Sequence, residues 1–205
     1  MASQTTGPAP VTAALAATIR DMPLAMYSRF VQRVRRRYPR ELALLPAGSP
    51  DRAAIVAVVE RLQSEGSSLV AALRIARQLT LERLCVLDVE DSAPLADITQ
   101  AMTDLAEATL EIALERTLAD QDERFGVPRD DKGDRIEFWI VGMGKLGAHE
   151  LNVSSDIDLV YVYEGDGQTE GARPGAGPLP SSAAPAPGAA TAGSVGVPSV
   201  WPLSS

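Results

Sequence analysis

The sequence predicts an α+β fold in which a layer of helices precedes a short strand-containing segment and a low-complexity tail. Apolar residues recur at helical spacing in residues 11–130, two runs rich in β-branched and aromatic residues follow in 131–170, and Ala, Pro, Gly and Ser dominate 171–205. We therefore expect a disordered N-terminus (1–10), a helical arm (11–130), a core segment with strands (131–170) and a disordered tail (171–205).

The helical arm is expected to start at Val11 and to consist of consecutive helices. Pro23 disturbs the first of them and Pro39 ends it, because proline lacks the backbone N–H that a helix interior needs. After a loop at residues 46–50, Asp51 is a candidate N-cap, since its carboxylate can accept a hydrogen bond from a free N–H of the first turn. The arm is therefore predicted to contain several helices separated by defined breaks.

The longest helix is predicted over residues 95–122, after breaks at residues 66–68 (Gly-Ser-Ser) and 91–94 (Asp-Ser-Ala-Pro). Its apolar stripe repeats at alternating steps of four and three residues: Ile98, Met102, Leu105, Thr109 and Ile112. A stripe of this kind predicts that the helix packs against its neighbours along its whole length.

The core segment contains two predicted strands, at residues 136–141 and 157–163. A glycine turn, Gly-Lys-Leu-Gly, occupies residues 144–147, and the stretch 145–152 has room for only about two helical turns. The expected order is therefore strand, glycine turn, short helix and a second strand that begins with acidic residues.

Asp156 and Asp158 form the most informative feature of the chain. Because side chains on a strand alternate between its two faces, both carboxylates are expected on one side, with Ile157 directed into the core. Mg²⁺ is usually held by one or two carboxylates together with substrate phosphates. The pair therefore indicates a magnesium site for transfer at a phosphorus atom, although an Asp-x-Asp pattern alone is also typical of a solvated strand face.

The glycine turn is expected to bind the anionic part of the substrate. Backbone N–H groups near Gly144 and Gly147, at the start of the short helix, can contact a phosphate, and Lys145 can add a positive charge. Ser155 can cap a turn and contact the same substrate. Without the two aspartates, these residues would fit an ordinary surface turn equally well.

Residues 142–159, GMGKLGAHELNVSSDIDL, resemble the signature of the glutamine synthetase adenylyltransferase family. Members of this family are bifunctional enzymes that add AMP to a tyrosine of glutamine synthetase and remove it. The resemblance implies that residues 131–170 are part of a polymerase β-type nucleotidyltransferase core in which Asp156 and Asp158 hold Mg²⁺. It also implies that ATP or ADP binds through Gly144, Lys145, Gly147 and Ser155.

The resemblance extends over about residues 20–170 and includes the helical arm. Because the signature follows a single helical arm, it implies the first of the family's two catalytic domains. In that domain, phosphate removes AMP from the tyrosine and ADP leaves. The implied partners are glutamine synthetase and, through parts of the full enzyme that are missing here, a PII-type signalling protein.

The sequence departs from the family pattern in two places. Ala148 occupies a position where glycine is usual, and the composition after Glu170 cannot bury a core, with Arg173 as its only charged residue. The family continues with further strands, one of which supplies a third acidic residue to the metal pair. We therefore expect a truncated chain that is inactive by itself.

Composition limits the partners and the compartment. A net charge of −8 argues against nucleic acid, and the arginines between residues 33 and 40 are expected on a solvated helix face. The single cysteine, Cys85, excludes an internal disulfide and suits a small core residue. No apolar run of about 18 residues and no signal peptide are present, so we expect a cytoplasmic protein without a membrane partner.

Two other functions fit parts of the sequence. Gly142, Gly144 and Gly147 spell Gly-x-Gly-x-x-Gly after a predicted strand, which is the pattern of dinucleotide-binding oxidoreductases. That fold needs a helix of about a dozen residues before its second strand, which residues 145–152 do not provide. The second alternative is a non-catalytic helical interaction fragment.

His149, the only histidine, is expected at the surface and not as a general base.

Overall fold

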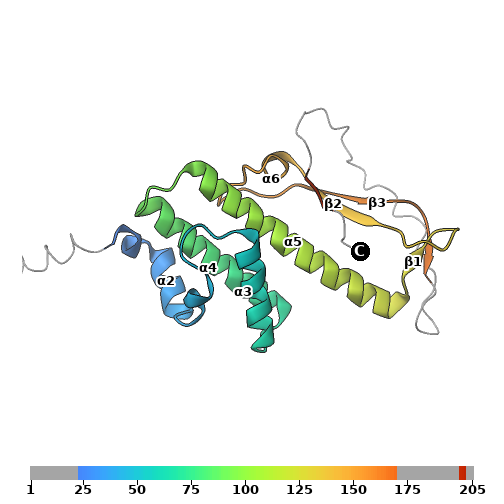
Figure 1. Cartoon of the computed structure of the whole chain (residues 1–205), viewed down its shortest axis with the longest axis horizontal. Coiled ribbons are helices and arrows are strands. Elements are labelled where there is room, and N and C mark those ends of the chain that lie inside the picture. The colour runs from blue at the N-terminus through green and yellow to red at the C-terminus, as the bar shows by residue number, and fades with distance from the viewer. Residues whose placement is uncertain (1–22, 170–198, 202–205) are drawn as a thin grey trace, which may run out of the picture.

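A computed structural model describes residues 23–169 and the backbone of residues 199–201. Figure 1 shows the helices packed together at one side of the molecule, with the second half of the longest helix and a narrow β-sheet both extending away from them. The α+β class is as predicted, with helices as the larger part. The predicted N-terminus (1–10), the helix start at Val11 and most of the predicted tail (171–205) lie outside the described residues.

The arm contains four α-helices and two 3-10 turns in its described part. They are η1 (Leu24–Tyr27), α2 (Arg29–Arg37), η2 (Glu41–Leu44), α3 (Arg52–Ser64), α4 (Leu69–Val89) and α5 (Leu95–Phe125). Three helices begin with a side-chain oxygen that accepts a backbone hydrogen bond: Ser28 for α2, Asp51 for α3 and Ser68 for α4. The predicted N-cap at Asp51 is confirmed, and so are the breaks at residues 66–68 and 91–94.

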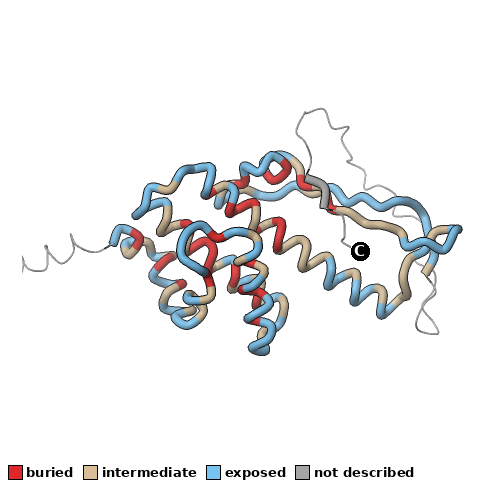
Figure 2. Tube along the Cα trace, viewed as in Figure 1, coloured by how far each residue is buried: buried red, intermediate tan, exposed pale blue. Residues whose placement is uncertain are grey.

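Two clusters of buried apolar residues hold the arm together. One lies between α2, α3 and α4 and includes Val34, Val58 and Leu79. The other lies between α3, α4 and α5, and it also takes in Leu146 and Leu151 from beyond the arm. Figure 2 shows the buried positions concentrated where these helices meet. Because each fully buried large apolar side chain contributes about 1.5–3 kcal/mol, these clusters are the main source of stability in the described part.

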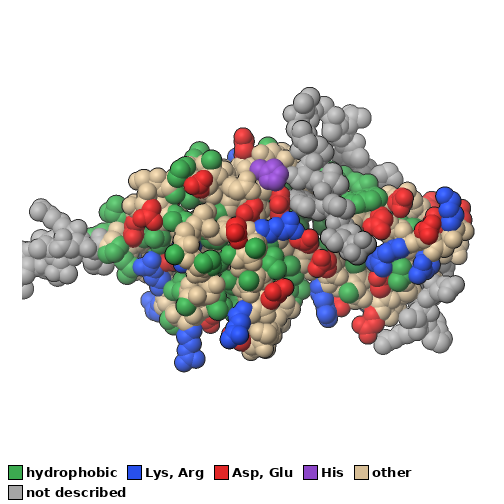
Figure 3. Space-filling view, viewed as in Figure 1, with side chains coloured by type: hydrophobic (Ala, Val, Ile, Leu, Met, Phe, Trp, Pro, Cys, Tyr) green, Lys and Arg blue, Asp and Glu red, His purple; other side chains and the backbone are tan. Residues whose placement is uncertain are grey.

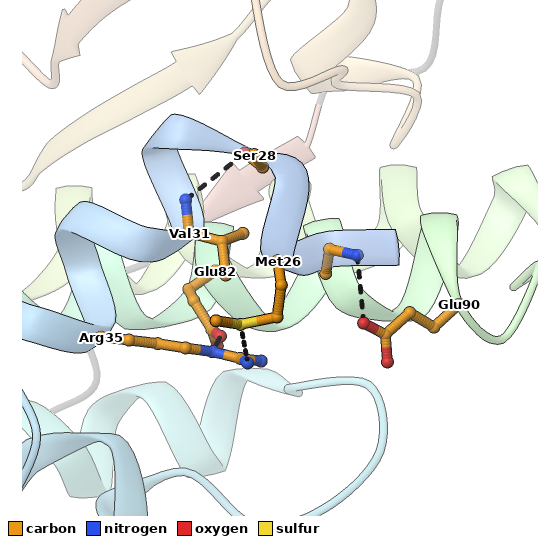
Figure 4. Close-up of polar contacts among 7 residues, drawn as sticks. Met26, Ser28, Val31, Arg35, Glu82 and Glu90 are labelled. Atoms are coloured by element: carbon orange, nitrogen blue, oxygen red, sulfur yellow. Dashed lines mark hydrogen bonds and ion pairs between the residues drawn. The ribbon is translucent and has the colours of Figure 1, made fainter. Parts of the chain in front are cut away.

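Polar contacts attach η1 and α2 to α4 (Figure 4). Arg35 donates from Nε to a carboxylate oxygen of Glu82 at 2.6 Å, and Glu82 is buried. The N–H of Ala25 donates to Oε1 of Glu90 at 3.1 Å. The prediction that the arginines of α2 occupy a solvated face is therefore wrong for Arg35, because a buried carboxylate on the neighbouring helix requires a cationic partner.

Helix α5 ends at Phe125, slightly beyond the predicted residue 122, and packs over only part of its length. Ile98, Met102 and Leu105 are buried, whereas most residues after 114 are exposed (Figure 2). The prediction of packing along the whole helix is therefore wrong. An apolar stripe shows which face of a helix can pack, but the extent of packing depends on how far the neighbouring helices reach. Here α3 and α4 cover the first half (Figure 1).

The strands form two small antiparallel sheets. β2 (Phe138–Gly142) lies between β3 (Leu159–Tyr163) and β5 (Ser199–Trp201), while β1 (Pro128–Arg129) pairs with β4 (Gln168–Thr169). A dinucleotide-binding crossover requires parallel strands joined by a long helix. The antiparallel pairing of β2 with β3 therefore shows that the dinucleotide-binding alternative is wrong.

Two further expectations concern cysteine and membranes. Cys85 is a free cysteine in α4 and is half-buried, so it lies at the margin of the core and not inside it. Across the described ranges, no helix combines the length and the apolar character needed to cross a membrane.

Candidate functional site

The loop between β2 and β3, residues 143–158, carries all of the predicted site residues. It begins with α6 (Gly144–Gly147), which is a single helical turn where about two turns were expected. The loop adds one backbone bond to the β2–β3 ladder, because the N–H of Met143 donates to the carbonyl of Asp158 at 2.9 Å. The two ends of the loop are thereby held together.

The end of α6 explains why the helix is short. His149 has a left-handed backbone conformation, with φ of 57°. The N–H of Glu150 then donates to the carbonyl of Lys145 at 2.8 Å, and the N–H of His149 donates to the carbonyl of Leu146 at 3.1 Å. This pair of bonds is the Schellman arrangement that ends many helices. Ala148 has φ of −88°, which alanine adopts without strain, so glycine is not required at this position.

Helix α5 anchors the loop to the arm. Leu146 and Leu151 are 1% and 3% exposed and belong to the core cluster around α5. The N–H of Leu151 donates to Oγ1 of Thr103 at 3.4 Å, and Thr103 is itself fully buried. The arm is therefore the support on which the loop is positioned.

Glu107 lies one turn after Thr103 on α5 and is 7% exposed. Its Oε1 lies 3.7 Å from Nδ1 of His149, whose side chain is 47% exposed. Figure 3 shows the single histidine at the molecular surface. Burial raises the pKa of the Glu107 carboxyl, and the neighbouring His149 and Arg52 oppose this rise. Helix α5 thus presents one hydroxyl and one carboxyl group to the loop.

A chain of hydrogen bonds brings the glycine turn to the segment that carries the aspartates. Lys145 donates from Nζ to Oγ of Ser155 at 3.3 Å. Ser155 donates from Oγ to Oδ1 of Asn152 at 2.7 Å, and the N–H of Ser154 donates to the same oxygen at 3.2 Å. Two of the predicted site residues, Lys145 and Ser155, are therefore in direct contact.

Asp156 and Asp158 precede β3, which begins at Leu159, so the predicted strand start at residue 157 is two residues too early. Both aspartates are exposed, and Ile157 between them is 39% exposed, so the expectation that Ile157 faces the core is wrong. Two solvent-accessible carboxylates fit Mg²⁺, which keeps several waters. Within the described part of the chain, no three His, Cys, Asp or Glu side chains are grouped to hold a metal ion.

A cleft of about 310 Å³ lies between the arm and this segment; we call it the arm–loop cleft. Its walls include Arg77 of α4, Met102 and Leu105 of α5, and Ser155, Asp156 and Ile157 of the loop. Most of the lining is apolar, because both α5 and the loop contribute aliphatic side chains. The first aspartate of the pair is therefore part of a concave surface that the helical arm completes.

Comparison with known proteins identifies the family. A sequence model of the glutamate-ammonia ligase adenylyltransferase family matches residues 19–178, which is more than half of the chain. The chain belongs to this family. The match includes both the helical arm and the loop with the aspartates, so the two parts described above occur together in the family.

Relatives with established names support the same assignment. Bifunctional glutamine synthetase adenylyltransferase/adenylyl-removing enzymes from Burkholderia pseudomallei and Burkholderia mallei are each 38% identical, over 76% and 74% of this chain. The corresponding protein of Bordetella pertussis is 44% identical over 49% of the chain. This family member spans only 18% of the length of the first relative and 17% of the second.

Sequence reasoning missed three residues that the structure brings to the site of this family member. Thr103 of α5 accepts a backbone hydrogen bond from the loop, Glu107 of α5 lies 3.7 Å from His149, and Arg77 lines the arm–loop cleft from α4. The sequence did contain a signal for two of them: a threonine and a glutamate lie four residues apart on an apolar helix face. Polar residues at such positions require a partner from another element. No comparable signal distinguished Arg77 from the other arginines of the arm.

Proposed function

We propose that this chain is part of a nucleotidyltransferase that acts on glutamine synthetase and contributes the site that removes AMP from a tyrosine. The main support for the proposal is the hydrogen bond from Lys145 to Ser155, which connects the glycine turn to the segment that contains the aspartates. This contact gathers the phosphate-binding and the metal-binding candidates within one loop between two paired strands. The family of the chain and the names of its relatives agree with this activity.

Each residue has a distinct role in the proposal. Asp156 and Asp158 would hold Mg²⁺, which on binding would neutralise charge on the phosphate of the adenylyl group. Lys145 places a positive charge beside the same phosphate, while Ser155 fixes the lysine by accepting its hydrogen bond. Gly144 has φ of 56°, a conformation that glycine adopts at no steric cost, so the chain can turn here directly after β2.

The proposed reaction is a phosphorolysis. An oxygen of inorganic phosphate forms a bond to the adenylyl phosphorus, and the bond from that phosphorus to the tyrosine oxygen breaks. The tyrosine oxygen takes up a proton, and ADP leaves. Phosphate is itself the nucleophile, so no side chain has to act as a general base. A cytoplasmic location is part of the same proposal.

Substitution of the aspartates tests the proposal in a full-length protein that contains this segment. Asp156→Asn and Asp158→Asn should each lower the release of ADP from adenylylated glutamine synthetase by at least about 100-fold, since each removes a metal ligand. Glu150→Gln, which changes an exposed carboxylate in the same loop, should leave the rate unchanged. Wild-type phosphorolysis in both aspartate variants would show that the assignment is wrong.

We also infer that the 205-residue chain alone does not complete the reaction. Val160, Tyr161 and Val162 of β3 are between 38% and 61% exposed, so the sheet that follows the aspartates is not covered in the described part. A site is held accurately only when the elements around it are packed. Incubation of the purified chain with adenylylated glutamine synthetase, Mg²⁺ and phosphate should release no ADP above the background rate. Release at the rate of a full-length relative would contradict this inference.

A further inference from the structure

The arm–loop cleft combines three elements that are distant in the sequence. Arg77 comes from α4, Met102 and Leu105 come from α5, and Asp156 comes from the loop. Its volume of about 310 Å³ is at the lower end of the range for small-molecule sites, about 300–1,000 Å³. The cleft is therefore large enough for part of a nucleotide, and it includes one of the two proposed metal ligands.

The polar groups of the cleft have opposite charges. Arg77 is exposed and makes no hydrogen bond or ion pair within the described residues, although it shares the cleft with Asp156. Other arginines pair with carboxylates: Arg35, Arg52, Arg61, Arg116 and Arg135. The guanidinium of Arg77 therefore keeps all five N–H donors available for a ligand.

The walls between these charges are largely apolar and come from both α5 and the loop. A planar base can lie against such side chains, and a guanidinium matches the oxygens of a phosphate with two parallel hydrogen bonds. A phosphate near Asp156 needs an intervening cation, which agrees with the proposed Mg²⁺ site. The ligand that satisfies all of these groups has an apolar planar part and an anionic phosphorus group.

We propose that the arm–loop cleft binds the adenine nucleotide, with the base against Met102 and Leu105 and with Arg77 donating hydrogen bonds to the phosphates. This assignment rests on the proposed function and adds a nucleotide-binding residue from the helical arm. The arm then has two tasks: it supports the loop through Thr103, and it completes the binding site through Arg77.

Calorimetric titration of the 205-residue chain with ADP and with adenosine, both in the presence of Mg²⁺, tests the role of Arg77. Arg77→Ala should weaken ADP binding by about tenfold or more, because hydrogen bonds to charged groups are lost, and should leave adenosine binding unchanged. Arg77→Lys keeps the charge but not the two parallel donors, so its affinity for ADP should lie between those of the wild type and Arg77→Ala.

Arg74→Ala is the matched control. Arg74 lies three residues earlier on α4, is also exposed, and lines a different cleft with Arg33 and Arg37. Its substitution should leave the affinity for ADP unchanged. Thermal unfolding of both variants should match the wild type, since substitution of an exposed arginine without a partner changes stability by about 0.5 kcal/mol or less.

Three results would overturn the assignment of Arg77. These are an unchanged ADP affinity in Arg77→Ala, an equal loss in Arg74→Ala, and the absence of ADP binding by the wild-type chain. Asp156→Asn separates this failure from failure of the proposed function. If Mg²⁺-dependent ADP binding is lost in Asp156→Asn but kept in Arg77→Ala, the role of Arg77 is wrong and the proposed function stands. If neither substitution affects ADP binding, both proposals are wrong.

Discussion

The helical arm and the β2–β3 region differ in how they bury apolar side chains. In the arm, Leu79 and Leu84 are at most 1% exposed, and each is surrounded by residues from several helices. In β3, Val160 is 46% and Tyr161 is 61% exposed. The comparison indicates that the arm stabilises the described part of the chain, whereas the β2–β3 region depends on its attachment to α5.

The attachment itself is small and specific. Leu146 and Leu151 are buried in the core cluster of α5, and Thr103 accepts one backbone hydrogen bond from the loop. The residues proposed for chemistry lie on the exposed side of this attachment. The proposed metal ligands Asp156 and Asp158, together with Lys145, therefore lie outside the buried clusters that stabilise the chain, so substitutions can address these exposed residues and the buried clusters separately.

The largest effect is expected from a cavity in the arm. Leu79→Ala should lower the free energy of unfolding by about 2–5 kcal/mol, because a fully buried leucine loses its contacts. Val160→Ala in β3 should change it by less than about 1 kcal/mol, since that side chain is already half exposed. Urea unfolding of both variants measures the difference. Equal losses would contradict the contrast between the two regions.

The next effect concerns the ion pair between α2 and α4. Arg35→Ala removes the cation from the buried carboxylate of Glu82 and should cost about 1.5–3 kcal/mol. The value should fall toward the lower end, because the side chain of Arg35 is 36% exposed to solvent. Arg36→Ala, at the exposed neighbouring position, is the control and should be neutral. Urea unfolding measures the free energy of unfolding of both variants. If both are destabilised equally, the effect comes from the loss of positive charge on α2 and not from the contact with Glu82.

A smaller and more local effect is expected where the two regions join. Thr103→Val keeps the shape of the side chain but removes the oxygen that accepts from Leu151, at a cost of about 1 kcal/mol. Amide hydrogen exchange should become faster at Leu151 while the amides of α3 keep their protection. Thr117→Val, on the exposed end of α5, removes a similar hydroxyl that does not touch the loop. Faster exchange at Leu151 in this control would contradict the proposed attachment.

The smallest effect depends on pH. Burial raises the pKa of the Glu107 carboxyl above its ordinary value of 4.5, so the folded state binds this proton more tightly than the unfolded state. The contribution of Glu107 to stability is then greatest at low pH and declines as pH rises through the raised pKa. Glu107→Gln lacks this titration, so its melting temperature relative to wild type should rise between pH 4.5 and pH 7. If the melting temperature of Glu107→Gln falls relative to the wild type over this pH range, the folded state binds the proton of Glu107 less tightly than the unfolded state, and the prediction is wrong.

The local features of the fold could be predicted from the sequence. Asp51 was recognisable as an N-cap, and the Gly-Ser-Ser and Asp-Ser-Ala-Pro segments as breaks, because these signals act within one turn of the chain. The strands on both sides of the loop were found within two residues. The predicted side-by-side placement of Asp156 and Asp158 for one metal ion stays a prediction, since both precede the strand on which it was based.

Other features required knowledge of distant contacts. The burial of Glu82 next to Arg35, the exposure of the second half of α5 and the arm–loop cleft all depend on which helices lie beside each other. The shortness of α6 had a subtler cause, since it follows from the left-handed backbone of a histidine, a conformation that is uncommon for residues other than glycine. Apart from the end of α6, each of these features depends on residues that are far apart in the sequence.

The sequence by itself determined the helical character of the arm, the order of strand, glycine turn and aspartates, and membership of the family, because caps, periodicity and motif spacing are properties of neighbouring residues. Only the tertiary structure decided that α5 supports the loop through Thr103, that Glu107 lies beside His149, and that Arg77 shares a cleft with Asp156. The physical reason is that burial and electrostatic pairing depend on the distances between elements, and those distances are set by how the helices and strands pack together.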